Sequence, residues 1–252
     1  MKLPPPSAPS TTFVNAKGSN VIQEYAIAAR ANPDCIPTMA ETPRELKDLQ
    51  KEALARQYVI IVDRSGSMGA ADGRGTHWDS ARDAVTRMID TVLNYDIDHT
   101  VPVYIFDNEC VFIGEVTKAS QVKQIFTEFK PRGTTDLNNV LVEALETYAG
   151  TKRPNYELVP GTTFIVLLDG GADDEDAVMK TVCRFADPRN GYVANHTQIA
   201  ISLCQIGDDP SATRFLKRLD DEIEPDICDT QKDDILSETG GLDRLLYSAI
   251  FD

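Results

Sequence analysis

Oxygen-bearing side chains follow the first strongly apolar stretch of the sequence. Residues 58–62 read Tyr-Val-Ile-Ile-Val, a run typical of a buried parallel strand. Asp63, Ser65 and Ser67 come directly after it, with Gly66 between the two serines. Because glycine lets a loop curl tightly, the carboxylate and the two hydroxyls can converge on one point. Such hard oxygen ligands suit Mg²⁺, Mn²⁺ or Ca²⁺ rather than zinc.

Two later turns carry the same kind of chemistry. Thr134 lies in Gly-Thr-Thr-Asp, just before an apolar periodic stretch, and Asp169 ends the apolar run at residues 163–168. In an open α/β sheet, ligands sit in the crevice at the carboxyl ends of the strands. We therefore expect the three turns to meet at one edge of the sheet.

The elements that must position these turns alternate between strand and helix. We expect strands at residues 58–63, 100–106, 110–113, 163–168, 197–206 and 225–228. Helices are expected at residues 78–95, 120–129, 137–148, 173–185, 211–219 and 242–251. This order predicts an α/β fold with a doubly wound, mostly parallel sheet and helices on both faces. Only three residues separate the second and third strands, so the third should be an antiparallel edge strand.

Together these turns resemble the metal-ion-dependent adhesion site (MIDAS) of von Willebrand factor A (vWA) domains. The first motif of that site has the form Asp-x-Ser-x-Ser, and a Thr and an Asp on two later loops complete it. The resemblance covers about residues 58–230 and implies a Rossmann-like fold. It implies a metal site, with Mg²⁺ as the expected ion and Mn²⁺ or Ca²⁺ as alternatives, held by Asp63, Ser65, Ser67, Thr134 and Asp169.

The resemblance also implies how these side chains act. Ser65 and Ser67 would ligate the metal directly, Thr134 directly or through water, and the two carboxylates largely through water. Thr134 is preferred to Thr135, because in the resembling domains the ligand is the first Thr after the small or basic pair. Mg²⁺ takes six oxygens at about 2.1 Å, and two neutral hydroxyls leave it under-neutralised. A partner protein's Asp or Glu can then complete the coordination, so the implied function is a metal-dependent adaptor or adhesion module and not an enzyme.

Within the vWA family, residues 215–221 and 226–230 are similar to the intracellular tellurite-resistance and copine-like branch. That similarity implies a role in multiprotein assemblies and in stress response.

Two other interpretations compete with the adaptor. A strand-terminal Asp63 beside Mg²⁺ also suits a phosphohydrolase-like enzyme, but such enzymes carry a second acid two residues later, where this chain has Ser65. The sequence has neither a Walker A loop nor a Gly-x-Ser-x-Gly elbow. The third interpretation is a structural domain without metal dependence.

Several other residues are expected to serve structure. Asp136 is expected to cap a helix and Asp107 to stabilise a hairpin turn, with a supporting role at the metal as the alternative. Trp78 is expected to anchor packing. Arg64 is expected to face solvent or a partner. His77, like the other two histidines, matches no metal-ligand spacing and is expected to be structural or exposed.

The composition limits the possible partners and the location. The formal net charge is −15, and residues 58–252 hold 34 Asp and Glu against 18 Lys and Arg. This field disfavours nucleic acid and anionic membranes and favours metal cations and basic partners. The alternative is that the acidity only maintains solubility. Five dispersed cysteines indicate reduced thiols. Because no apolar run could span a membrane and the first residues lack a secretory apolar segment, we expect a cytoplasmic protein.

The chain is expected to divide into two parts. Residues 1–57 should form an N-terminal extension, with a Pro- and Ser-rich arm at residues 1–20 and a helix at residues 42–56. Residues 58–252 should form the vWA domain. At 252 residues and 42% hydrophobic content, the chain is long enough for one large core.

Overall fold

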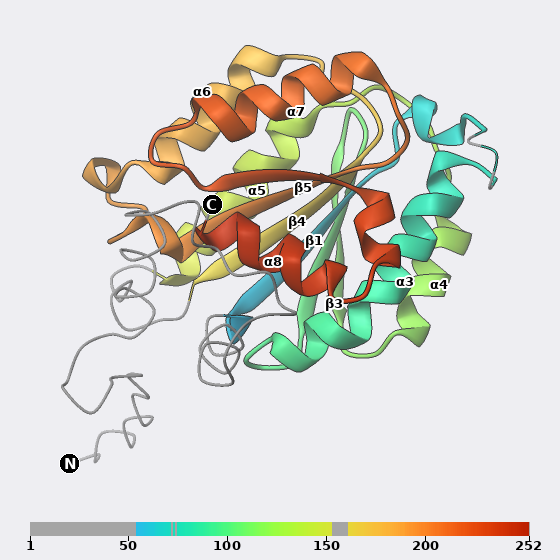
Figure 1. Cartoon of the computed structure of the whole chain (residues 1–252), viewed down its shortest axis with the longest axis horizontal. Helices are drawn as coiled ribbons and strands as arrows, with labels where there is room; N and C mark the ends of the chain where they lie inside the picture. The colour runs from blue at the N-terminus through green and yellow to red at the C-terminus, as the bar shows by residue number, and fades with distance from the viewer. Residues whose placement is uncertain (1–53, 72, 74, 153–160, 252) are drawn as a thin grey trace, which may run out of the picture.

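A computed structural model describes residues 54–71, 73, 75–152 and 161–251. The expected arm at residues 1–20 and nearly all of the expected helix at residues 42–56 lie outside this range, so the division at residue 57 stays a prediction. One six-stranded sheet, in the order β3-β2-β1-β4-β5-β6, organises the described chain. Helices cover both of its faces (Figure 1).

The central strands are continuous apolar runs because they are buried on both faces. β1 (Gln57–Asp63) lies between β2 (Val101–Phe106) and β4 (Thr162–Leu168) and runs parallel to both. β5 (Ile199–Gln205) pairs in parallel with β4. β3 (Cys110–Val116) pairs antiparallel with β2 at one edge. The predicted α/β fold, with a mostly parallel sheet and one antiparallel edge strand, is confirmed.

Side chains alternate between two apolar cores, one on each face of the sheet. Ile60 and Val62 of β1 face the core covered by α3 (His77–Tyr95), α4 (Ser120–Glu128) and α8 (Gly241–Phe251). Ile61 faces the core covered by α5 (Leu137–Lys152), α6 (Glu175–Ala186) and α7 (Pro210–Glu222). The two groups of helices lie on opposite sides of the sheet (Figure 1). The sheet is therefore rigidly held, and its rim can support a defined site.

The last strand differs most from the prediction. β6 (Cys228–Lys232) replaces the strand expected at residues 225–228 and pairs in parallel with β5. Its sequence is Cys-Asp-Thr-Gln-Lys, so apolar content could not locate it. As an edge strand it has one unpaired side, and polar residues are tolerated there.

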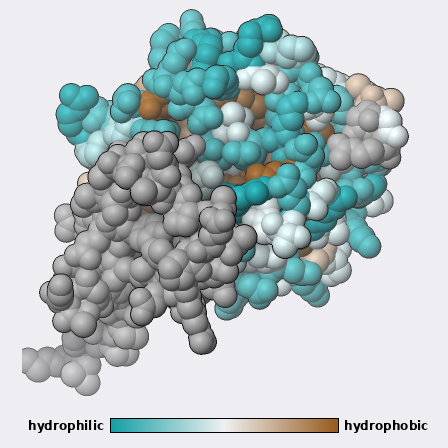
Figure 2. All heavy atoms as spheres, viewed as in Figure 1, coloured by the Kyte–Doolittle hydropathy of each residue, from teal (hydrophilic) through white to brown (hydrophobic). Residues whose placement is uncertain are grey.

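Short 3₁₀ helices complete the architecture. η2 (Gly66–Gly69) follows β1, and η6 (Asp233–Ser237) precedes α8, while η4 (Pro188–Asn190) and η5 (His196–Gln198) connect α6 to β5. None of the described helices has the length and apolar content needed to cross a membrane. The described surface visible in Figure 2 is mostly hydrophilic, with small hydrophobic areas between the polar ones.

The strand order places the switch point of the sheet beside β1. After β1 the chain continues to β2 and β3 on one side, and β4 then pairs with the other side of β1. Loops leaving the carboxyl ends of β1 and β4 diverge there and leave a crevice, which is where open α/β sheets bind ligands. Asp63 ends β1 and Asp169 directly follows β4.

Candidate functional site

The innermost group of the candidate site is the carboxyl group of Asp63. This side chain is fully buried. Its Oδ1 accepts a hydrogen bond of 2.6 Å from the backbone N–H of Ser65, whereas its buried Oδ2 accepts none of ordinary geometry from the described residues. Burial raises the pKa of Asp63 to about 7, and the nearby charge of Asp169 acts in the same direction. A buried acceptor without a partner costs stability unless something else satisfies it.

A chain of hydroxyl hydrogen bonds joins the turn after β1 to the turn after β4. Ser67 Oγ donates to Asp169 Oδ1 at 2.8 Å. Since Ser67 has only one hydroxyl proton, Ser65 must be the donor in the 2.9 Å contact between the two serine oxygens. Ser65 and Asp169 are buried, and Ser67 is exposed. The chain therefore joins two buried groups through an exposed hydroxyl, and both serine hydroxyls keep lone pairs.

The loop that carries Thr134 is bound to the turn after β1 through its backbone. Gly66 N–H donates to Gly133 O at 3.1 Å, and Arg132 N–H donates to Arg64 O at 2.7 Å. Gly133 has a φ of 71°, and a Cβ there would lie 2.3 Å from Asn108 Oδ1, so this position requires glycine. Thr134 itself is exposed, and within the described residues its hydroxyl is not part of the hydrogen-bonded chain.

Thr135 and Asp136, the neighbours of Thr134, serve the backbone. Thr135 is buried, and its N–H donates to Asp173 Oδ1 at 3.2 Å. Asp136 Oδ1 accepts from Asn139 N–H at 3.0 Å in the first turn of α5, so the predicted helix cap is confirmed. Of the two threonines, only Thr134 is open to solvent.

Arg64 and Asp107 form an ion pair beneath the site, which corrects the expectation that Arg64 faces solvent or a partner. Arg64 is only 5% exposed, and its Nη2 lies 3.0 Å from Oδ2 of the fully buried Asp107. The guanidinium also lies over the ring of Phe129, 5.5 Å from its centroid. Arg132 Nε reaches the same Oδ2 at 2.8 Å. Because Arg64 and Arg132 come from different loops, Asp107 holds the two loops together.

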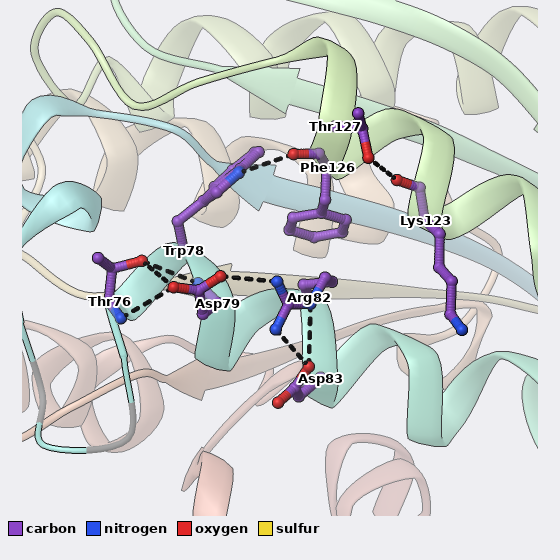
Figure 3. Close-up of polar contacts among 8 residues, drawn as sticks. All are labelled: Thr76, Trp78, Asp79, Arg82, Asp83, Lys123, Phe126 and Thr127. Carbon is purple, nitrogen blue, oxygen red and sulfur yellow. Dashed lines mark hydrogen bonds and ion pairs between the residues drawn. The ribbon is translucent and has the colours of Figure 1, made fainter.

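His77 belongs to the site although the sequence reasoning left it out. Its Nδ1 lies 2.7 Å from Asp169 Oδ2, and the ring is about one-fifth exposed, at 19%. It is the first residue of α3, directly after the N-cap Thr76, whose hydroxyl accepts from Asp79 N–H while Asp79 accepts from Thr76 N–H. Figure 3 shows this capping box, with Trp78 packed on Phe126 beside it. A helix that starts at the carboxyl edge of a sheet presents its first residue to that edge, and this was the signal available in the sequence.

The sequence of this region matches a known family. Residues 58–161 match the family model of the von Willebrand factor type A domain, and the matched segment includes the turn after β1 and the Thr134 loop. This segment of the chain is therefore similar to vWA domains.

A solved vWA domain has a similar fold. The SpRpn10 VWA domain is similar, with 13% sequence identity, a TM-score of 0.51, and coverage of 76% of this chain and 93% of that one. The manganese-loaded TRAP protein of Plasmodium vivax is also similar, with 14% identity, a TM-score of 0.49, and coverage of 71% and 69%. No curated protein is detectably similar in sequence.

The donor set of the candidate site combines hydroxyl and carboxylate oxygens. No three His, Cys, Asp or Glu side chains of the described residues gather closely enough to hold a metal ion. Four of the five predicted ligand positions are nevertheless connected, since Asp63, Ser65, Ser67 and Asp169 form one hydrogen-bonded set. All their side-chain donors are oxygens, the ligands that Mg²⁺, Mn²⁺ and Ca²⁺ prefer, and Asp63 Oδ2 has no hydrogen-bond partner among the residues that the structure describes. The residues present therefore fit such an ion.

Proposed function

We propose that this chain carries a vWA domain that is a protein-binding module and depends on a divalent metal ion, with Mg²⁺ as the expected ion. vWA domains are typically protein-binding modules, which is the general function that the family match supports. The observation that carries the metal-dependent form is the hydrogen-bonded chain from Ser65 through Ser67 to Asp169. It lies beside the buried Asp63, whose Oδ2 has no hydrogen-bond partner in the described part of the chain.

Each residue of the proposed site has a distinct task. Ser65 and Ser67 offer neutral hydroxyl oxygens, and Asp169 orients the Ser67 hydroxyl through its Oδ1. Asp63 supplies negative charge from the interior and fixes the turn through the Ser65 amide. Thr134, exposed on the neighbouring loop, offers a third hydroxyl at the surface. A bound Mg²⁺ would supply a positive centre that a carboxylate from outside can ligate.

The proposed partner is a protein that offers an Asp or Glu side chain. Neutral hydroxyls contribute no charge, so the site neutralises a dication only in part, and an incoming carboxylate completes both charge and coordination. Ser67 and Thr134 are the exposed members of the set, which places the open side of the site at the surface. Such an arrangement suits a protein partner that presents one acidic side chain.

Calorimetric titration of the full chain with Mg²⁺ and Mn²⁺ tests the metal. We expect binding by the wild type and a loss of at least about a hundredfold in affinity in the Ser65→Ala, Ser67→Ala double variant, because two direct ligands are removed. Ser120→Ala is the matched control, since Ser120 is an exposed serine at the start of α4. Equal isotherms for the double variant and the wild type would disprove the assignment.

A second experiment tests whether the metal serves binding. Partner proteins are captured by the immobilised chain in Mg²⁺ or in EDTA, identified, and measured again after their acidic residues are replaced by Asn or Gln. We expect capture to require Mg²⁺, the intact Ser65–Ser67 turn and one acidic residue of the partner. Equal capture in Mg²⁺ and in EDTA would remove the metal from the function.

The burial of Asp63 argues against the phosphohydrolase alternative. A nucleophilic carboxylate must reach the substrate phosphorus, and Asp63 is fully buried beneath the Ser65 turn. Hydrolysis of p-nitrophenyl phosphate that disappears in Asp63→Asn would restore this alternative.

The proposal extends to the intracellular branch that includes tellurite-resistance and copine-like proteins. The support is the sequence of residues 215–221 and 226–230, together with free thiols at Cys110, Cys183, Cys204 and Cys228, which are typical of a reducing compartment. A cytoplasmic location, tested by fractionation, would agree with it.

A further inference from the structure

We infer that His77 is a positioning residue of the proposed metal site and that it acts by fixing the carboxylate of Asp169. This inference rests on the proposed function. It assigns a role to a residue that contacts the loops after β1, β4 and β5 and that the Asp-x-Ser-x-Ser, Thr and Asp motifs do not include.

The contact between His77 and Asp169 is well defined. A carboxylate can only accept hydrogen bonds, so His77 Nδ1 is the donor in the 2.7 Å contact with Oδ2. The other carboxylate oxygen, Oδ1, accepts from Ser67. With one donor on each oxygen, the Asp169 carboxylate is held against rotation, and it is nearly buried, with 2% of its side chain exposed.

The imidazole ring of His77 is itself held in place on its far side. Gly207 follows β5 with a φ of 75°, and a Cβ there would lie only 2.8 Å from His77 Nε2 and 3.1 Å from Cε1. The Gly207 backbone therefore packs against the ring edge opposite the Asp169 contact. Any larger residue at position 207 would press the ring toward Asp169 or displace it.

The backbone of His77 ties the same residue to the loop after β1. His77 N–H donates to Ala70 O at 3.0 Å, and Ala70 N–H donates to Ser67 O at 2.7 Å. His77 thus contacts the loop of Ser67 through its backbone, Asp169 through Nδ1, and Gly207 through its ring. A change at this residue is transmitted to both the hydroxyl and the carboxylate sides of the site.

The physical consequence is preorganisation. A carboxylate free to rotate loses conformational entropy when it binds a metal or its water, whereas one fixed beforehand does not. Residues that orient metal ligands in this way commonly change metal affinity by 10- to 100-fold, roughly, when they are replaced. Because Oδ2 is already engaged by His77, Asp169 is also less available to chelate with both oxygens, which leaves a coordination place for the partner's acid.

Four full-chain variants separate the hydrogen bond from the packing of the ring. Asn places its side-chain N–H near the position of His Nδ1, Leu has a similar size without a donor, and Gln carries the same amide one bond farther out. We measure Mg²⁺ affinity by calorimetry and folding by thermal denaturation for His77→Asn, His77→Leu and His77→Gln, with Ser67→Ala as the reference for a lost ligand.

We expect His77→Leu and His77→Gln to bind Mg²⁺ about 10- to 100-fold more weakly than the wild type, and His77→Asn to stay within about threefold of it. Wild-type affinity in His77→Leu, or equal weakening in the Asn and Leu variants, would overturn the inference. If His77→Leu does not fold, the Asn and Gln variants test the inference. Weaker Mg²⁺ binding in His77→Gln than in His77→Asn supports it, and equal binding by the two overturns it. A wild type that binds no Mg²⁺ would overturn the proposed function and this inference together, whereas a loss confined to Ser67→Ala would overturn the inference alone.

Discussion

The two ends of the central sheet both contain buried charged side chains but satisfy them differently. At the amino ends of the strands, Arg56 is 3% exposed and donates from Nη2 to Thr162 O at 2.9 Å and to Gln198 O at 3.4 Å. Asp96 is 1% exposed and accepts from three backbone N–H groups, those of Tyr58, Asp98 and Thr100.

At the carboxyl ends, the buried acid Asp63 has one oxygen that accepts from a backbone amide and one that no donor of the described residues reaches. Its neighbours are hydroxyls and a carboxylate from other turns, whose hydrogen-bonding capacity is only partly used. Asp96 receives backbone N–H groups on both of its oxygens, whereas Asp63 Oδ2 receives none from the described residues. A missing partner does not by itself mark a site, since the buried Nε of Arg56 also lacks one among those residues. What distinguishes Asp63 is that partly used hydroxyls and a carboxylate from other turns lie beside it, where the molecule is adapted to bind something.

The largest expected effect concerns the amino end of the sheet. Arg56→Met should lower the free energy of unfolding by about 3 kcal/mol, because it leaves two buried carbonyls, Thr162 O and Gln198 O, without their donor. Urea denaturation measures this change. Mg²⁺ affinity should stay at the wild-type value, and a parallel loss of Mg²⁺ binding would show that the two ends of the sheet are not independent.

Asp107→Asn should affect both fold and site. Loss of the buried charge that pairs with Arg64 and Arg132 should lower the free energy of unfolding by about 2 kcal/mol. It should also weaken Mg²⁺ binding, since Asp107 joins the two loops that carry Ser65 and Thr134. Urea denaturation and calorimetry on the same sample test both parts. Exposed Glu109, which also pairs with Arg132, provides the control Glu109→Gln, which should change neither quantity.

Asp63→Asn should raise the free energy of unfolding, whereas the other substitutions lower it. Because the folded protein raises the pKa of Asp63 from 3.8 to about 7, its contribution to stability is fully present below pH 3.8 and is lost as the pH rises through 7. In EDTA at pH 8 the variant should therefore be more stable than the wild type, by about 1 to 2 kcal/mol.

Thermal denaturation between pH 4 and 8 measures this difference. Equal pH profiles for the Asp63→Asn variant and the wild type would indicate that the folded protein does not raise the pKa of Asp63. In Mg²⁺ the wild type should be more stable than the Asp63→Asn variant, because only the wild type gains stability from binding the metal.

The smallest expected change in stability concerns Thr76, a residue at the carboxyl end of the sheet with a purely structural role. Thr76→Ala removes the side chain that caps α3 and should lower the free energy of unfolding by about 1 kcal/mol. Thr76→Ser keeps the capping hydroxyl and should retain most of the stability that Thr76→Ala loses. Urea denaturation measures both variants, and a loss in Thr76→Ser as large as in Thr76→Ala would mean that the cap is not the cause.

Much of the fold could be predicted because it is written in local patterns. The run at residues 58–62 is apolar on both faces, and α3 carries its apolar stripe at helical spacing. β6 could not be found in this way, because four of its five residues are polar and its place is set by pairing with β5. Arg64 was expected at the surface because a lone arginine in a loop gives no local sign of a buried partner 43 residues away.

The types and order of the oxygen-bearing residues at the proposed site were determined by the sequence alone, because each of them sits at a turn that its flanking apolar segments define. Only the tertiary structure decided which of these groups touch and which remain unsatisfied. His77 and Asp169 are 92 positions apart, and no local pattern reports a hydrogen bond between two turns that come together only when β1 and β4 pair.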